Sequence, residues 1–218
     1  MHHTQFPHPW QPEPLFLDEH IIAVNKPANM LSVPGKGPDK QDCLVARVSA
    51  VYPDSLTIHR LDYATSGVIL LARNTVAHRA MSRLFETRNI EKRYVAVVAG
   101  LVAQETGEIN QPLICDWPNR PLQKVDHAQG KPATTRYQRI DINPHVPCSR
   151  LALTPITGRS HQLRVHLQWL GHPILGDEFY APSEIRQLSR RLLLHAERVA
   201  FTHPITGAAI AIECPAEF

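Results

Sequence analysis

Short apolar runs and alternating apolar and polar positions recur along the 218-residue chain, and they predict a fold dominated by strands. Residues 15–27 are expected to form two strands joined by a tight Asp-Glu-His turn, with Pro27 ending the second strand. Further strands are expected at residues 67–72, 92–100, 134–140, 150–156, in the second half of 186–204, and at 207–215. The Pro-rich stretch 101–135 predicts irregular structure.

Apolar residues at helical spacing predict a smaller number of helices. One lies within residues 41–53, and another begins after Asn74, whose side chain can cap it. A third helix is expected at 160–171, with Ser160 as its cap and Gly171 as its end, and residues 186–204 are expected to begin as a helix. Because strands outnumber helices and hairpin-like turns often join them, the sequence predicts an α+β fold with a mixed, mostly antiparallel sheet.

Nothing in the chain reads as a linker, so residues 15–218 are expected to form one domain behind an extended, Pro-rich arm at 1–14. The arm has no apolar core typical of a secretory signal, and the longest apolar runs are too short to span a membrane. Four scattered cysteines without a Cys-x-x-Cys pair argue against zinc and a disulfide framework, and they suit the reducing cytoplasm. No feature requires more than a monomer.

The formal net charge of +3 is unevenly distributed. Residues 47–93 hold eight Arg and Lys against four Asp and Glu, and residues 117–139 hold five against one. Such basic segments are either ordinary solvated faces or a phosphate-binding surface. Nucleic acid is therefore one of the partners that the charge pattern allows.

Three polar clusters carry candidate chemistry. In HRLDYATSG, at 59–67, Asp62 is either a cleft residue or an aspartate that hydrogen-bonds its own turn. In the strand EKRYVAVV, Tyr94 is either functional or a half-buried strand residue. In the predicted helix at 160–171, His161, Arg164 and Gln168 are spaced to share one face, which suits phosphates or a carboxylate unless it is simply solvated.

Motifs for cofactor, metal and acyl-transfer chemistry are missing from the sequence. There is no G-x-G-x-x-G, Walker loop, G-x-S-x-G elbow or H-E-x-x-H. His161 and His166 stand about 140° apart around a helix, so they do not converge on one metal ion. The sequence therefore predicts no nucleotide cofactor, no metal site and no acyl-transfer triad.

Five ordered blocks give the chain a specific resemblance. VNKPANMLSVPG at 24–35, HRLDYATSG at 59–67, KRY at 92–94, GKPATTRY at 130–137 and TGRSHQLRVH at 157–166 closely resemble the RluA family of pseudouridine synthases. The segment DWPNRPLQK at 116–124 resembles the branch with a dual target, a uridine in the tRNA anticodon stem-loop and one in 23S ribosomal RNA. The resemblance implies a central, mostly antiparallel sheet crossed by a catalytic cleft and flanked by helices, without the additional S4 domain of some relatives.

The resemblance also implies roles for individual residues. Asp62 matches the catalytic carboxylate, Arg164 the cation that keeps it ionised, and Tyr94 the tyrosine that stacks on the uracil. Substrate-binding and base-flipping positions are expected at Arg60, His59, Leu163 and Lys131, with Arg60 filling the gap left by the flipped base. Phosphate contacts are expected from Arg79, Arg83, Arg88, Lys92, Arg93 and Lys124.

Other readings stay open at this point. A two-carboxylate glycoside hydrolase would need a second acid near Asp62, and a non-catalytic RNA-binding relative would lack Asp62, Tyr94 or Arg164. A purely structural protein would leave the five blocks unexplained. Within the family, the target could also be only one of the two RNAs, or a different position in rRNA or tRNA.

Overall fold

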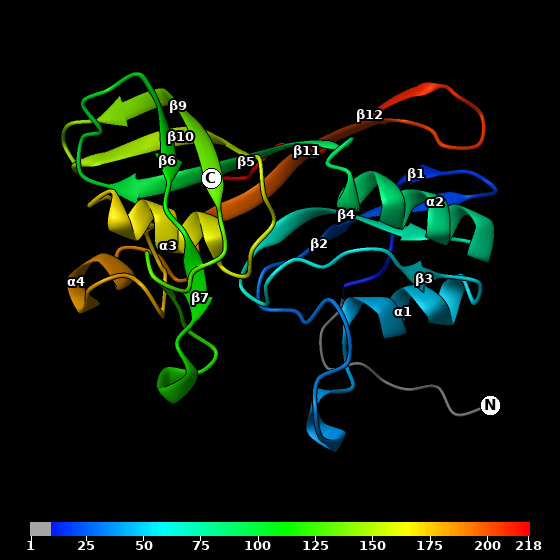
Figure 1. The fold of residues 1–218 in the computed structure, drawn as a ribbon. Coiled ribbons are helices and arrows are strands. Elements are labelled where there is room, and N and C mark those ends of the chain that lie inside the picture. Colours follow the sequence, from blue (N-terminus) through cyan, green and yellow to red (C-terminus); the bar gives the residue numbers. More distant parts are fainter. Residues whose placement is uncertain (1–9) are drawn as a thin grey trace.

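The computed structural model describes residues 10–218, so most of the arm predicted at 1–14 lies outside the described residues. Ten strands form one sheet in the order β1-β2-β4-β11-β5-β10-β9-β6, with β12 paired to β11 and β3 paired to β4. Its strands are β1 Pro14–Leu17, β2 Ile21–Lys26, β3 Leu56–Thr57, β4 Ser66–Ala72, β5 Glu91–Ala99, β6 Thr106–Asn110, β9 Thr134–Asn143, β10 Cys148–Pro155, β11 Leu194–Thr202 and β12 Ala209–Glu213. All named pairings in the sheet are antiparallel except that of β4 with β11, so the expected α+β class with a mixed sheet is confirmed (Figure 1).

A two-stranded hairpin, β7 Leu113–Cys115 and β8 Gln123–Val125, projects from the main sheet with a short helix η2, Trp117–Asn119, at its tip (Figure 1). The prediction of irregular structure for 101–135 was therefore wrong for β6, β7 and β8. These strands are only three to five residues long, so their period-two pattern is too short to stand out.

Helices α1, Leu44–Val51, and α2, Thr75–Glu86, cover opposite faces of the N-terminal half of the sheet. Alternate residues of β2 and β4 pack against each helix, which is why all seven residues of β4 are buried. Asn74 caps α2 as predicted, since its Oδ1 accepts a hydrogen bond from the Ala77 amide at 2.8 Å.

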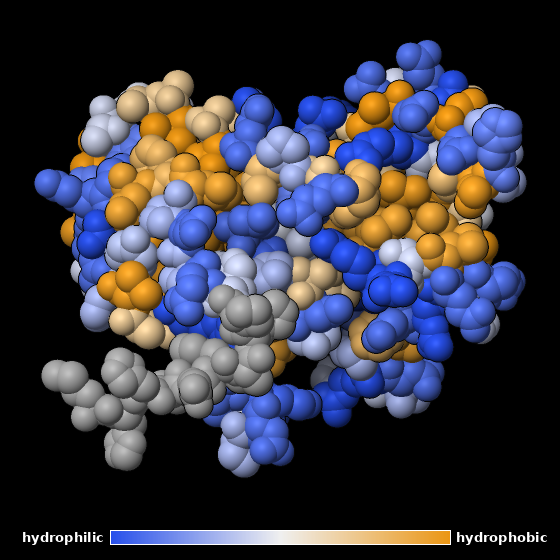
Figure 2. Space-filling model, turned by 180° about the vertical axis from the view of Figure 1, so that it is seen from behind, coloured by the Kyte–Doolittle hydropathy of each residue, from blue (hydrophilic) through white to orange (hydrophobic). Residues whose placement is uncertain are grey.

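The C-terminal half packs its own core between the sheet and helix α3, Gln162–Trp169. Leu163 and Leu167 of α3 pack there against Leu151 and Leu153 of β10. Two further short helices are η1, Pro38–Lys40, and α4, Ser183–Arg186. Seen from behind, the molecule carries two apolar areas separated by polar residues (Figure 2).

Two predicted helix starts are corrected. Ser160 does not cap α3, because His161 takes a left-handed conformation with φ 53° and the helix begins at Gln162. The Gln162 side chain holds this entry by accepting hydrogen bonds from the Thr157 hydroxyl at 2.6 Å and the Arg159 amide at 3.0 Å. The predicted helical start of 186–204 is also wrong, because α4 ends at Arg186 and an irregular segment leads to β11.

Candidate active site

The loop 58–65 connects β3 to β4 at the centre of the sheet and carries Asp62. At its end, Gly67 lies directly opposite Ala196 of β11 in the parallel pair. Gly67 has φ +116°, and a Cβ at this position would lie 2.3 Å from the Ala196 carbonyl oxygen. The glycine of the Thr-Ser-Gly turn therefore lets the loop enter the sheet next to β11, one strand away from β5.

Residues of the segment 24–35 fix the same loop by hydrogen bonds to its backbone. The Lys26 ammonium, fully buried, donates hydrogen bonds to the backbone oxygens of Tyr63 at 3.1 Å and Met30 at 2.8 Å. Ser32 donates to the Leu61 carbonyl at 2.7 Å and accepts from the Leu61 amide at 3.1 Å. Burial lowers the pKa of Lys26 to about 7, against the raising effect of the Asp62 charge. Lys26 and Ser32 were not predicted as site residues, because only the family block and no local chemistry marked them.

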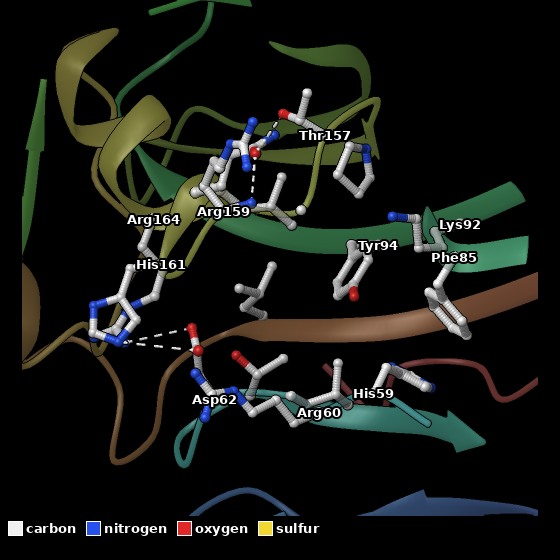
Figure 3. A pocket seen from close by; sticks show the side chains of 17 residues that line it. His59, Arg60, Asp62, Phe85, Lys92, Tyr94, Thr157, Arg159, His161 and Arg164 are labelled. Carbon is white, nitrogen blue, oxygen red and sulfur yellow. Dashed lines mark hydrogen bonds and ion pairs between the residues drawn. The ribbon is translucent and has the colours of Figure 1, made fainter. Parts of the chain in front are cut away.

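A cavity of about 270 Å³ opens beside Asp62, slightly below the ~300–1,000 Å³ that is usual for small-molecule pockets. Four parts of the chain line it: the Asp62 loop, β5 with the end of α2, the segment that leads from β10 into α3, and the start of β11 (Figure 3). The lining residues are His59, Arg60, Leu61, Asp62, Thr65, Phe85, Lys92, Tyr94, Pro155, Thr157, Gly158, Arg159, His161, Gln162, Leu163, Arg164 and Leu194. Asp62 is the one carboxylate among them, within the part of the chain that the structure describes.

Each oxygen of the Asp62 carboxylate faces a nitrogen of the α3 segment. Oδ1 lies 4.0 Å from Nε2 of His161, and Oδ2 lies 4.0 Å from Nη1 of Arg164. Figure 3 shows these two side chains on one side of Asp62 and Tyr94 on the other. The spacing argument for a shared helix face was nevertheless only partly right, since His161 precedes the helix and Gln168 does not line the cavity.

The closest partner of Arg164 is Asp177 rather than Asp62. Arg164 donates to Asp177 from Nε at 2.8 Å and from Nη2 at 2.6 Å, and both side chains are buried. The guanidinium carbon also lies 5.0 Å from the ring centres of Phe179 and Tyr180. Asp177 thus orients Arg164, and the sequence assigned it no role. The signal available was weak: Asp177 stands in the partly apolar segment ILGDEFY, but Glu178 follows it directly, and an aspartate is rarely buried without a charged partner.

Tyr94 points from β5 into the cavity, beside Lys92 and on the same face of the strand. Burial, and next the negative charge of Asp62, raise the pKa of Tyr94 above its ordinary value. The phenol is therefore neutral around pH 7. In the free protein Tyr94 offers a ring face and a hydroxyl group rather than a phenolate.

The expected substrate-binding residues separate into two groups. His59, Arg60 and Leu163 line the cavity. His59 stacks on Phe85, with 4.4 Å between ring centres, and its Nε2 accepts a hydrogen bond from the Leu70 amide. Lys131 does not reach the cavity, because its backbone pairs with Leu113 at the base of the β7–β8 hairpin.

The expected phosphate contacts lie on several surfaces. Arg79, Arg83 and Arg88 are exposed on α2 and the turn after it, and Lys92 lines the cavity. Arg93 points to the opposite face of β5 from Lys92, and it pairs with Glu197 at 3.4 Å, so it stays outside the cavity. Lys124 is exposed on the hairpin, 3.8 Å from Asp116.

Solved structures share this fold. The structure titled human RNA pseudouridylate synthase domain containing 1 superimposes with a TM-score of 0.80 at 26% identity, covering 95% of this chain and 84% of the other. Human RNA pseudouridylate synthase domain containing 4 gives 0.73 at 24% identity, covering 93% and 87%, which bears on the fold alone. The chain thus shares the fold of two proteins titled RNA pseudouridylate synthase domain containing.

Sequence comparisons name the family. A family described as RNA pseudouridylate synthase matches residues 20–169. The chain is 50% identical over 204 residues to the dual-specificity RNA pseudouridine synthase RluA of Yersinia pestis, covering 94% of this chain and 98% of that protein. It is 49% identical to the RluA of Escherichia coli strain K12, covering 94% and 93%. The chain belongs to the RNA pseudouridylate synthase family, and it is an isomerase. No helix in residues 10–218 is long and apolar enough to cross a membrane.

Proposed function

We propose that the protein converts uridine to pseudouridine at two kinds of site, the tRNA anticodon stem-loop and 23S ribosomal RNA. The dual target is supported by the name of its relatives at about 50% identity and by the segment DWPNRPLQK at 116–124. We further propose that residues 15–218 act as one catalytic domain in a cytoplasmic monomer. Recognition of one loop shape in both RNAs would explain the two targets.

The single observation that carries the proposal is that, among residues 10–218, Asp62 is the one carboxylate that lines the cavity. Asp62 faces Arg164 and His161, and a tyrosine lies across from it. Two carboxylates about 5–10 Å apart are the usual requirement for glycoside hydrolysis, and Asp177, the other carboxylate bound to Arg164, is fully buried and does not line the cavity. The site therefore favours isomerisation over hydrolysis.

Asp62 has two possible parts in the isomerisation. As a nucleophile, its oxygen would bond to C1′ while the C1′–N1 bond breaks and the electron pair stays on the uracil. The freed base would then turn, and its C5 would displace Asp62 from C1′. The proton on C5 would leave, and N1 would carry one in the product, so that no atom is gained or lost. As a base, Asp62 would instead take the proton on C2′ while the C1′–N1 bond breaks and uracil leaves with the electron pair, which gives a glycal. The turned base would then join C1′ through C5 while C2′ takes its proton back, and the C5 proton would leave as N1 gains one. Both routes need an ionised carboxylate, and Nη1 of Arg164 lies 4.0 Å from its Oδ2.

The other cavity residues suit handling of a flipped base. Tyr94 offers its ring for stacking on the uracil, and Leu163 closes the cavity with apolar surface. Arg60 is exposed at the rim, where a planar guanidinium can stack in the gap that the base leaves. Because the phenol is neutral, Tyr94 needs an acceptor near it, such as a substrate oxygen or Asp62, before it can take up the C5 proton.

The RNA backbone would lie over the basic side chains next to the cavity. Lys92 stands inside it, and Arg79, Arg83 and Arg88 extend the positive surface along α2. Arg93 is withdrawn from this set because it faces the other side of β5. Lys124 and Lys131 belong to the hairpin region and would contact a different part of the RNA.

Tritium release tests the proposal. Transcripts of the anticodon stem-loop and of 23S rRNA fragments, labelled with tritium at uridine C5, are incubated with the protein, and tritium in water is measured. Release from both RNAs is expected. Release from only one RNA would restrict the function to that substrate, and release from neither would contradict the proposal for both.

A further inference from the structure

His161 is held by a residue from a distant part of the chain. Its Nδ1 lies 2.6 Å from the hydroxyl oxygen of Tyr180. The same hydroxyl oxygen accepts a hydrogen bond from the Gln123 amide of β8 at 2.9 Å. The buried Tyr180 hydroxyl has one proton to donate, and Nδ1 of His161 is the acceptor that lies within hydrogen-bond distance of it among the described residues, so we assign the O–H as donating to Nδ1.

This geometry selects one tautomer of the imidazole. A ring whose Nδ1 accepts a hydrogen bond carries its single proton on Nε2 when it is neutral. Burial lowers the pKa of His161, although the Asp62 charge opposes this, so the neutral form prevails at pH 7. Nε2 then faces Oδ1 of Asp62 at 4.0 Å, which is longer than a hydrogen bond, so the two groups have to close to bonding distance in the complex with RNA.

Tyr180 is itself rigidly placed. It is buried, and the Asp177 Oδ1 accepts hydrogen bonds from the amides of Phe179 at 2.9 Å and Tyr180 at 3.2 Å. Asp177 is also the partner of Arg164. Asp177 therefore acts on both groups that face Asp62: it binds Arg164 directly, and it fixes Tyr180, which contacts His161.

We infer that His161 is a positioning residue that orients the Asp62 carboxylate through a neutral Nε2–H, with Tyr180 setting its tautomer. Arg164 supplies charge to one oxygen, and His161 supplies a directed donor to the other. With both oxygens held in this way, the carboxylate keeps the lone pairs that face the cavity available to the substrate. This inference rests on the proposed catalytic role of Asp62.

Two substitutions at position 161 separate orientation from folding. Asparagine tolerates the left-handed backbone and can still reach Tyr180, but it is too short to place a donor at the Nε2 position. Glutamine can place an amide N–H near that position. His161→Asn should lower the single-turnover rate of tritium release by about 100-fold, with unchanged RNA affinity, and His161→Gln should recover most of the rate. The exposed His145→Asn serves as the matched control and should behave as the native protein.

The outcomes are read from rate, affinity and melting temperature together. A His161→Asn rate within about threefold of native, or a His161→Gln rate no higher than that of His161→Asn in equally stable variants, would overturn the inference. A loss confined to RNA affinity would also overturn it, because positioning acts on the bound complex.

The tautomer is measured without any activity. Long-range ¹H–¹⁵N spectra of the ¹⁵N-labelled protein at pH 7 should show His161 protonated at Nε2 alone, with its signals assigned by their loss in His161→Asn. Tyr180→Phe should relax this preference. A ring protonated at Nδ1, or at both nitrogens, would overturn the inference. If the native protein releases no tritium while this spectrum is as expected, the proposed function fails and the His161–Tyr180 geometry stands.

Discussion

Arg164 is bound to Asp177 by two hydrogen bonds, at 2.8 and 2.6 Å, and it turns its remaining nitrogen, Nη1, toward Asp62 at 4.0 Å. The arginine is thus anchored by one carboxylate and aimed at another. Asp177 holds the guanidinium and neutralises much of its charge. Arg164 can therefore face Asp62 without moving into direct hydrogen-bond contact with it. The cavity beside Asp62 stays open for a substrate.

Replacing Asp177 by asparagine should strongly destabilise the protein. Arg164 stays protonated, and the variant leaves its charge buried without its main counter-ion. The free energy of unfolding, measured by urea denaturation at pH 7, should fall by about 3–5 kcal/mol.

The exposed pair of Arg136 and Glu108 provides the control for that experiment. Its atoms are 2.9 Å apart, but both side chains are largely exposed. Glu108→Gln should therefore change the free energy of unfolding by less than about 1 kcal/mol. Equal effects of Glu108→Gln and Asp177→Asn would mean that the buried pair has no special structural role.

His59 should make stability depend on pH. Burial, and next the Lys92 charge, lower its pKa to about 3, and its Nε2 accepts the Leu70 amide. In the unfolded chain His59 binds a proton near its ordinary pKa of 6.5. Between these values the unfolded state binds more protons, so its stability contribution is lost as the pH falls from about 6.5 toward 3.

Glutamine at position 59 keeps a hydrogen-bond acceptor but does not titrate. Between pH 6.5 and 5, the native protein should lose about 1.5 kcal/mol of unfolding free energy relative to His59→Gln. Urea midpoints at a series of pH values measure this difference. A difference that does not change with pH would show that His59 is not held in its neutral form.

The arginines of α2 should contribute to RNA affinity through phosphate contacts. Arg79 and Arg83 stand one helical turn apart in an exposed depression. The double variant Arg79→Gln and Arg83→Gln should weaken RNA binding and reduce the slope of log K against log salt by about 2.

Arg186 on α4 is the matched control, since it is exposed and lies at the far side of the molecule from α2 (Figure 1). Arg186→Gln should leave affinity and salt slope unchanged. If the double variant and Arg186→Gln have the same salt slope, α2 is not part of the RNA surface.

The longer strands, α1 and α2 were predictable because each carries its own local pattern, whereas the short strands β6, β7 and β8 do not. The Asn74 cap and the buried run in β4 depend on neighbouring residues in the sequence, and both were confirmed. The start of α3 was not predictable in the same way. It depends on the left-handed His161 and on the hydrogen bonds of Gln162 to Thr157 and Thr134, which belong to the tertiary structure.

The site shows the same division. The family blocks predicted Asp62, Tyr94 and Arg164 as site residues, and all three line one cavity in the structure. The sequence did not predict the residues that orient this site. Asp177 and Tyr180 meet them only through the fold, and no spacing in the sequence links Tyr180 to Gln123 of the hairpin.

The most direct test of the account is the single-turnover rate of tritium release from C5-labelled stem-loop RNA by Asp62→Asn, compared with the native protein. Asparagine has nearly the same shape but can neither attack C1′ as a carboxylate nor accept the 2′ proton. With RNA affinity and melting temperature close to native, Asp62→Asn should release no tritium above background. Release at the native rate would contradict the assignment of Asp62 as the catalytic carboxylate.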